Sequence, residues 1–461
     1  MTESKLIQLL RTFSTEEWRR FNEFVASPYF NKKEELVIFS QYLRTLAPNF
    51  SPKKLSKVVI FKVIFQKKEY DEKRLSYLMN YLLELAEKFI GWKLIENQSA
   101  VLELNTLTAF ADRKLHKHYQ QKFRKTSLTL KDQKNSNQNF YLNQFMLADI
   151  ASKEFDNRMV RTFNGHLQNV TNHLDHFYFL NKLKYCCAII DRQQVLADKY
   201  ELNFVDELKI YLLQQNDNPP EIDIYLHVLL MLTEEKSNEY FDRLKVLFKT
   251  HFDLLTKPVK KEINFALINF CLRKIRKGEK TYVSEALDIY QDGIHSEVIF
   301  ENGFLSPWTF TNVVKLALRL KRYNWIKDFI WENESKISEQ FRENALYYNL
   351  SELYYYTKDY DQALDHLNRV KFSDLNYHLG SRVILIKIYY ETNEQFALTS
   401  LIASFMIFLK RNKNISSNLQ KTFLNFCEIL NLILRKKEGK NESIKTKIKE
   451  TTLLTDREWL Q

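Results

Sequence analysis

Three histidines have the spacing best suited to metal chemistry in this sequence. His166, His173 and His176 are separated by seven and three positions, which places them near one face of a helix. Imidazole is a common zinc ligand, but a tetrahedral site also needs a fourth ligand, and the sequence does not identify one. The other interpretation is that these rings are polar surface groups of a long helix, and we favour it. We therefore predict no metal and no cofactor.

Glycine spacing argues against the usual phosphate-binding loops. The chain of 461 residues has seven glycines, and the two nearest, Gly293 and Gly303, are ten positions apart, whereas a phosphate cradle needs clustered glycines. The sequence also has no Gly-x-Ser-x-Gly and no His-Glu-x-x-His. The adjacent Cys186 and Cys187 point about 100° apart on a helix, so we expect them to be small buried side chains. We predict that the protein is not an enzyme.

The net charge of +12 is concentrated in local runs. Between Asp112 and Lys134 there are eight basic residues and two acidic ones. Two interpretations stay open, because a basic run either only solubilises the chain or contacts phosphates in a nucleic-acid-associated regulator. The helices expected around Lys53–Phe65 and from Asp71 onward carry further lysines that suit the second interpretation. The candidate anion surface consists of Arg113, Lys114, Lys117, Lys122, Arg124 and Lys125.

Composition predicts an all-α protein. Seven glycines and seven prolines are too few for the many tight turns of a sheet protein of this length. The chain begins MTESKLIQLL, and its longest apolar run, Leu401–Leu409, contains Ser404, so we predict neither a signal peptide nor a membrane partner. Four cysteines without metal or redox spacing suit a reducing cytoplasm.

Helix signals divide the chain into three expected parts. Residues 1–97 are predicted to form an N-terminal helical bundle, in which Ser14 and Glu17 make a capping box before an aromatic helical face. Residues 98–220 read as a divergent array of helical hairpins. Residues 221–461 read as regular helical pairs that end in a basic helix.

One stretch, Ala345–Val370, carries a recognisable pattern of large and small residues. The pattern consists of Tyr347, Leu350, Ser351, Tyr354, Tyr360, Ala363 and Leu367. It resembles one tetratricopeptide repeat, and Ala363 and Leu367 recur 34 positions later as Ala397 and Leu401. The resemblance implies that the N-terminal bundle is followed by a right-handed α-solenoid of antiparallel helix pairs.

The resemblance also implies a binding surface, because the first helix of each such repeat lines a concave groove that receives peptides. The residues placed there by the pattern are Lys315, Arg319, Tyr348, Glu352, Tyr355, Tyr356, Arg382, Tyr389 and Tyr390. Aromatic and basic side chains are typical of binding hot spots, so we expect a non-enzymatic scaffold that binds a protein or an acidic peptide. Two alternatives remain: the tyrosines pack between helices, or the chain regulates nucleic acids through its basic surfaces.

Overall fold

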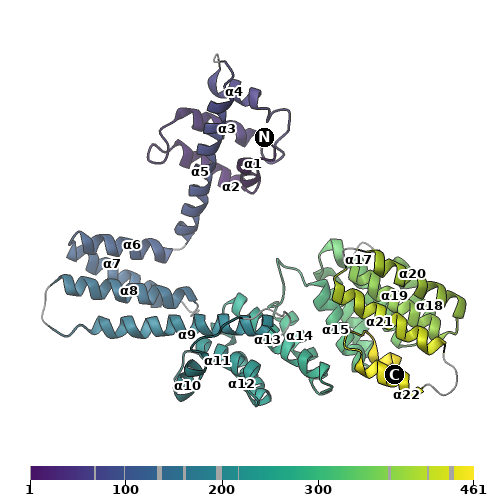
Figure 1. Cartoon of the computed structure of the whole chain (residues 1–461). Helices are drawn as coiled ribbons and strands as arrows, with labels where there is room; N and C mark the ends of the chain where they lie inside the picture. Colours follow the sequence, from purple (N-terminus) through teal and green to yellow (C-terminus); the bar gives the residue numbers. More distant parts are fainter. Residues whose placement is uncertain are drawn as a thin grey trace. The chain divides into compact units, whose positions relative to one another are not determined.

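The chain folds into α-helices throughout the part that the structure describes. The computed structural model describes residues 2–66, 69–97, 99–131, 138–158, 162–193, 200–215, 217–371, 375–412, 415–435 and 441–461. These residues contain 23 α-helices and no β-strand, and their sole bridge joins Glu301 to Phe304. The prediction of an all-α fold is therefore confirmed. The chain divides into two units, Met1–Tyr225 and Leu226–Gln461, and Figure 1 labels most of their helices.

The first unit contains ten helices and the start of an eleventh. They are α1 (Lys5–Leu10), α2 (Thr15–Ala26), α3 (Glu34–Leu46), α4 (Lys57–Phe65), α5 (Glu72–Asn97), α6 (Ser99–Asp112), α7 (His116–Lys131), α8 (Gln138–Asn157), α9 (Gly165–Gln193), α10 (Val205–Gln214) and α11 (Pro220–Thr233). The boundary between the two units falls within α11.

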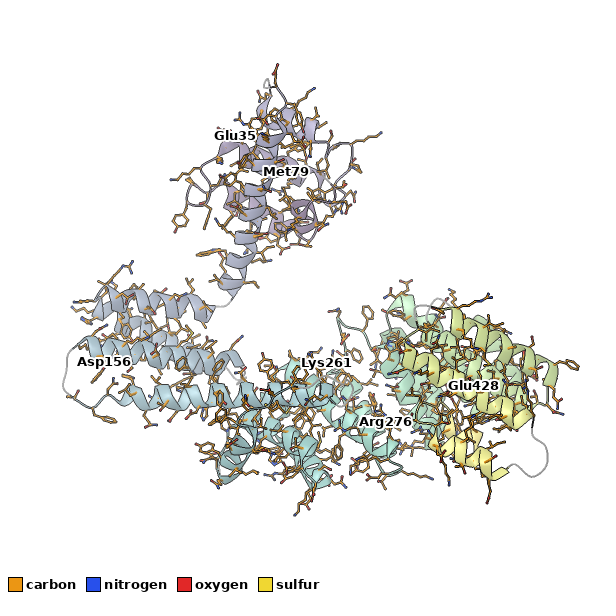
Figure 2. The ribbon with its side chains drawn as sticks, in the orientation of Figure 1. Glu35, Met79, Asp156, Lys261, Arg276 and Glu428 are labelled. Carbon is orange, nitrogen blue, oxygen red and sulfur yellow. The ribbon has the colours of Figure 1, made fainter. Side chains whose placement is uncertain are left out.

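Helices α1 to α5 share one apolar core. Its centre is aromatic, because Phe21 of α2 and Phe39 of α3 are fully buried. The predicted capping box is present: the Glu17 amide donates to Ser14 Oγ at 3.2 Å, and the Ser14 amide donates to Glu17 Oε2 at 2.7 Å. Figure 2 labels Met79 of α5, which packs against this core. The sequence thus fixes both the start of α2 and the face that it buries.

The second unit continues with helical pairs. Its helices are α12 (Ser237–Thr250), α13 (Lys257–Arg276), α14 (Tyr282–His295), α15 (Pro307–Arg319), α16 (Tyr323–Asn333), α17 (Glu339–Tyr356), α18 (Tyr360–Arg369), α19 (Leu375–Glu391), α20 (Gln395–Arg411), α21 (Ser417–Leu434), α22 (Asn441–Glu450) and α23 (Arg457–Leu460). Short 3-10 turns follow α12 (η1, Phe252–Leu254) and α16 (η2, Glu334–Lys336).

The same turn joins the two helices of three successive pairs. In each turn the residue two positions after the first helix has a positive φ: 55° at Lys321, 66° at Lys358 and 62° at Asn393. The amide of the next residue then donates to the carbonyl oxygen five positions back. These bonds run from Arg322 to Ala317 at 3.0 Å, from Asp359 to Tyr354 at 2.9 Å and from Glu394 to Tyr389 at 2.9 Å. This geometry satisfies the last carbonyls of the first helix. The turns recur at intervals of 37 and 35 residues.

Helices α17 and α18 show how the repeat pattern packs. Ser351 and Ala363 are fully buried, as small residues must be where two helices approach closely. Tyr347 and Tyr354 of α17 each stack on the ring of His366 in α18, with ring centroids 5.9 and 5.3 Å apart. Tyr347, Ser351, Tyr354 and Ala363 therefore lie between the paired helices, and the other side of α17 is left for different contacts.

Contacts between successive first helices hold these pairs together. We call α15, α17 and α19 the first helices; α15 packs against α17, and α17 packs against α19. Asn349 Nδ2 links α17 to α15 by donating to Thr311 Oγ1 at 3.1 Å. Among the helices of the described residues, none has both the length and the apolar composition needed to cross a membrane.

Candidate functional site

Equivalent positions of the three first helices form two rows across the second unit. The first row lies six residues before the positive-φ residue of each turn and consists of Lys315, Glu352 and Lys387. The second row lies two residues before it and consists of Arg319, Tyr356 and Glu391. Positions four residues apart lie on the same face of a helix. Because the first helices are neighbours, the first row carries charges of alternating sign from α15 to α19, and the second row runs from the cation Arg319 through Tyr356 to the anion Glu391. We call this surface, together with Tyr348, Tyr355 and Tyr390, the first-helix face.

The first part of this face is a cluster around Glu352. Its carboxylate is buried, accepts a hydrogen bond from the Tyr348 hydroxyl at 2.6 Å, and lies 3.6 Å from Lys315 Nζ. The Lys315 side chain remains half exposed. Burial and the charge of Glu352 raise the pKa of Tyr348 well above its usual value. Tyr348 therefore keeps its proton and acts as a donor at neutral pH.

Gly380 of α19 permits the close approach of that helix to Tyr348. A Cβ atom added at Gly380 would lie 2.4 Å from the Tyr348 hydroxyl oxygen and 2.8 Å from a ring carbon. Such distances are shorter than any van der Waals contact allows. Position 380 therefore has to be a glycine, since a side chain there would clash where α17 and α19 meet beneath the first-helix face.

The second part is a hydrogen-bond hub at Glu391. Its carboxylate accepts from the hydroxyls of Tyr355 and Tyr360 and pairs with Lys358 Nζ. It also accepts from Trp459 Nε1 at 2.9 Å. Burial raises the pKa of Glu391, but these donors outweigh it and lower the pKa to about 2. Glu391 is thus a carboxylate at every physiological pH, and Tyr355, whose pKa is raised by burial and by Glu391, remains a phenol.

Lys387 supplies a buried positive charge between these clusters. Only 5% of the residue is exposed, and its ammonium forms an ion pair with the carboxylate of Asp456. Nζ also lies 5.3 Å from the ring centroid of Tyr355 and 5.9 Å from that of Trp459. A buried ammonium is costly unless it is paired, so the site at Lys387 requires an anion, and aromatic rings stabilise the cation further.

The anion comes from the end of the chain itself, Thr451–Gln461, which we call the tail. Besides the Asp456 carboxylate, the tail provides the indole of Trp459, which packs edge-on against Tyr390 at 5.2 Å and against Phe426 of α21 at 6.0 Å. Leu460 is buried in the same core as α19 and α21. The first-helix face therefore receives an acidic residue and an aromatic residue three positions apart.

Two further contacts attach the tail to helices α21 and α22. The Asn425 side chain donates to the Leu453 carbonyl at 2.8 Å. The Arg457 guanidinium donates to the Ile448 carbonyl in the last turn of α22 and to the carbonyl of Thr451, the first residue of the tail. The end of α22 is a favourable place for a cation because it is the negative end of the helix. The tail thus connects the basic helix α22 to the first-helix face.

The structure brings most of the predicted groove residues to this face. Lys315, Tyr348, Glu352 and Tyr355 meet there through the contacts described above. Tyr356 is 40% exposed, and burial of its hydroxyl together with the charges of Glu352 and Asp456 raises its pKa to about 12. The charge of the exposed Arg319 acts on the pKa of Tyr356 in the opposite sense.

The remaining predicted residues of α19 have different surroundings. Arg382 is half-buried, and its Nε lies 3.3 Å from Nε2 of His378, whose ring packs against Phe408 of α20 at 4.5 Å. Tyr389 packs against the core that α19 shares with α21. Tyr390 is 40% exposed and meets Trp459. Tyr390 thus touches the tail directly, and Tyr389 packs against the core that contains Leu460 of the tail.

Sequence reasoning missed Lys387, Glu391, Asp456 and Trp459. The offset of 34 residues transferred Glu352 to position 386, but the turns at Lys358 and Asn393 are 35 residues apart. The correct offset transfers Glu352 to Lys387. A detectable signal was the lysine inside the otherwise apolar stretch that runs from Val383 to Ile388, because a charge at a buried position needs a partner.

The candidate anion surface lies at the turn between α6 and α7 and along α7. Lys122 pairs with Glu103 at 2.6 Å and is partly buried. The other five residues of the set are exposed: Arg113, Lys114, Lys117, Arg124 and Lys125. Lys134, at the end of the basic run, lies outside the described residues. The charge of this surface is thus largely open to solvent.

The three histidines of α9 do not converge. His166 packs near Phe123 and Phe155, with ring centroids 6.5 and 6.3 Å away, and His176 meets Tyr141 at 5.5 Å. Burial lowers the pKa of His173. Throughout the described ranges no group of three His, Cys, Asp or Glu side chains is arranged to hold a metal ion.

The chain matches no protein-family model, no curated protein and no solved structure. The function is therefore inferred from the geometry of the first-helix face.

Proposed function

We propose that this protein is a non-enzymatic scaffold that binds a protein or peptide on the first-helix face of a tetratricopeptide-like array. The observation that carries the proposal is the tail, because a segment of polypeptide already occupies this face. The face binds it through an ion pair at Lys387, a hydrogen bond at Glu391 and an aromatic contact at Tyr390. These are the kinds of contact that dominate protein interfaces.

The recurring turn supports the tetratricopeptide-like part of the proposal. Its intervals of 37 and 35 residues are close to the 34 residues typical of that family. Small buried residues separate α17 from α18, as the family pattern requires. In such arrays the first helices line the inner surface of a right-handed α-solenoid, and the predicted solenoid is therefore part of this proposal.

The part of the face that the tail leaves open has the chemistry of a hot spot. Tyr356 and Tyr390 are each 40% exposed, Lys315 is half exposed, and Arg319 faces solvent. Tyrosine and arginine contribute large contact areas and directed hydrogen bonds at interfaces. The exposed cations favour an acidic partner. Because all four cysteines are buried and none of them forms a disulfide, we keep the reducing cytoplasm as the proposed compartment.

Photo-crosslinking in the cells of origin tests the proposal. A photoreactive amino acid at Tyr356 is expected to capture a protein partner, whereas the same amino acid at Phe396, which is 95% exposed on the second helix α20, captures little. Arg319→Glu should reduce capture at Tyr356 without changing helical content, because it reverses a charge on the face. Equal capture from both positions, or capture that ignores Arg319→Glu, contradicts the proposal.

The second candidate function is a nucleic-acid-associated regulator, and the five exposed cations at α7 favour it. Such a protein would bind DNA or RNA tightly at about 50 mM salt and lose most of that affinity by about 200 mM, because phosphate contacts release counterions. Replacing Arg124 and Lys125 by glutamine should then weaken binding and reduce the salt dependence. Failure to bind either nucleic acid at low salt removes this candidate.

A further inference from the structure

We infer that the partner presents an acidic residue followed three positions later by a tryptophan, and that this segment displaces the tail from the first-helix face. The inference rests on the proposed function, and it names both the class of partner and the competition that controls access. The tail sequence Asp456-Arg457-Glu458-Trp459 is the template for this segment.

The charges of the face explain the acidic residue. Lys387 is buried beneath the tail, so any segment that replaces the tail and excludes water must supply an anion there. A neutral or basic residue at that position would leave a buried ammonium unpaired. Lys315, by contrast, is already paired with Glu352 at 3.6 Å. The requirement for an acid is therefore specific to the position that Asp456 now fills.

Glu391 and its neighbours explain the tryptophan. The Glu391 carboxylate already accepts bonds from Tyr355, Tyr360 and Lys358, and the indole Nε1 completes the set at 2.9 Å. Phenylalanine would fill the aromatic space beside Tyr390 but has no donor. Tryptophan combines the ring area with one N–H, so it satisfies both conditions at once.

Two features indicate that the tail can be displaced. The tail is helical only in the four residues of α23, which is too short for a helix that is stable alone. An open pocket of about 280 Å³ also lies beside Trp459, lined by Tyr390, Leu430, Ile433 and Ile444 among others. A partner segment whose apolar side chains also cover this pocket would bury more surface than the tail does.

The probe for this inference is a fluorescent peptide with the tail sequence TTLLTDREWLQ, titrated against the full chain. We call the chain with Asp456→Asn and Trp459→Ala the open variant, because its tail no longer competes with the peptide for the first-helix face. The peptide should bind this variant saturably and at least about tenfold more tightly than the unmodified chain, in which the attached tail acts at a high effective concentration. Fluorescence anisotropy measures the binding, and circular dichroism verifies that the variant keeps its helical content.

Matched substitutions test which contacts of the first-helix face recognise the peptide. Lys387→Met in the open variant should weaken peptide binding about 30-fold or more, because it removes one partner of a buried ion pair. Lys410→Met, on the exposed surface of α20, should leave binding unchanged. A peptide with the tryptophan replaced by phenylalanine should also bind more weakly. If the double variant loses helical content, the chain with Asp456→Asn alone takes its place.

Three outcomes would overturn the inference. The first is the absence of saturable binding to a folded open variant, and the second is equal binding of peptides with and without the acidic residue. The third is dimerisation of the unmodified chain that the open variant lacks, since the tail would then occupy a second copy. If the peptide fails while crosslinking at Tyr356 still captures a partner, the inference falls and the proposed function stands.

Discussion

The first-helix face of the second unit and the basic surface of α7 in the first unit both carry several charges, yet the charges differ in their surroundings. On the first-helix face, Lys387 is 5% exposed and lies among aromatic rings, with Asp456 as its counterion. On α7, residues such as Arg124 and Lys125 face solvent. Buried charges require a partner of defined chemistry, whereas exposed charges are satisfied by water and salt.

The two regions differ in how strongly their charges constrain a neighbouring group. The long basic run contributes to the net charge of +12, and residues of that run such as Arg124 and Lys125 are exposed. The single lysine in the apolar stretch of α19 is buried and requires an anion. In the proposed function, the face of α17 and α19 discriminates between segments, and the surface of α7 contributes a long-range attraction that falls with ionic strength.

The largest expected effect concerns the buried ion pair. Asp456→Asn should lower the free energy of unfolding by up to about 3 kcal/mol, because it removes the counterion of Lys387 and with it the ion pair that holds the tail over this ammonium. Urea unfolding followed by circular dichroism measures the change. Lys387→Met combined with Asp456→Leu should recover most of the loss. A loss below about 0.5 kcal/mol for Asp456→Asn would place this pair with ordinary surface pairs and erase the contrast with α7.

A smaller effect is expected where α19 approaches α17. Gly380→Ala should cost about 2 kcal/mol, since its Cβ would lie 2.4 Å from the buried Tyr348 hydroxyl. Gly91→Ala in α5, which has open space around it, is the matched control and should stabilise by about 0.5 to 1 kcal/mol. Thermal melts of both variants test the pair. A stabilising Gly380→Ala would show that Tyr348 is free to move.

A pH-dependent effect is expected from Glu391. Its pKa is about 2 in the folded protein and 4.5 ordinarily, so the stability it contributes is present above pH 4.5 and is lost as the pH falls toward 2. The contribution of Glu391 should be about 1.5 kcal/mol, and the acid-induced loss should be smaller by that amount in Glu391→Gln, because other carboxylates with lowered pKa values, such as Glu17, keep their own share. Urea midpoints between pH 5 and pH 2.5 measure it. Glu428→Gln, at an exposed position of α21, should retain the full acid dependence.

The smallest effect is expected on α7. Replacing Arg124 and Lys125 by glutamine should change the free energy of unfolding by less than about 0.5 kcal/mol, as is usual for exposed charges. The same urea unfolding experiment gives the value. A loss of more than about 1 kcal/mol would mean that these cations have structural partners, and the contrast between the two regions would disappear.

Local signals of the sequence predicted much of the fold. The Ser14–Glu17 capping box and the helix boundaries around Tyr356 and Tyr360 follow from residues within one or two turns of each other. The packing of Tyr347 and Tyr354 follows from the spacing of the repeat. Such features depend on short-range geometry, which a sequence records directly.

The candidate site could be predicted only in part, because it depends on register and on a distant segment. An offset of 34 residues transfers Glu352 to Ile386, whereas an offset of 35 transfers it to Lys387. Because adjacent residues lie on different sides of a helix, this difference of one residue changes which side of α19 is assigned to the first-helix face. The contact between Trp459 and Glu391 spans 68 positions. No periodicity within the repeats indicates that the end of the chain returns to them.

We propose that the first-helix face recognises an acidic residue through Lys387. A double-mutant cycle between the chain and a free peptide tests this recognition most directly. The open chain with and without Lys387→Met is titrated with the tail peptide with and without Asp456→Asn. The account predicts a coupling of at least about 1.5 kcal/mol, as measured for close charge pairs at interfaces. Additive effects, with no coupling between the two substitutions, would contradict it.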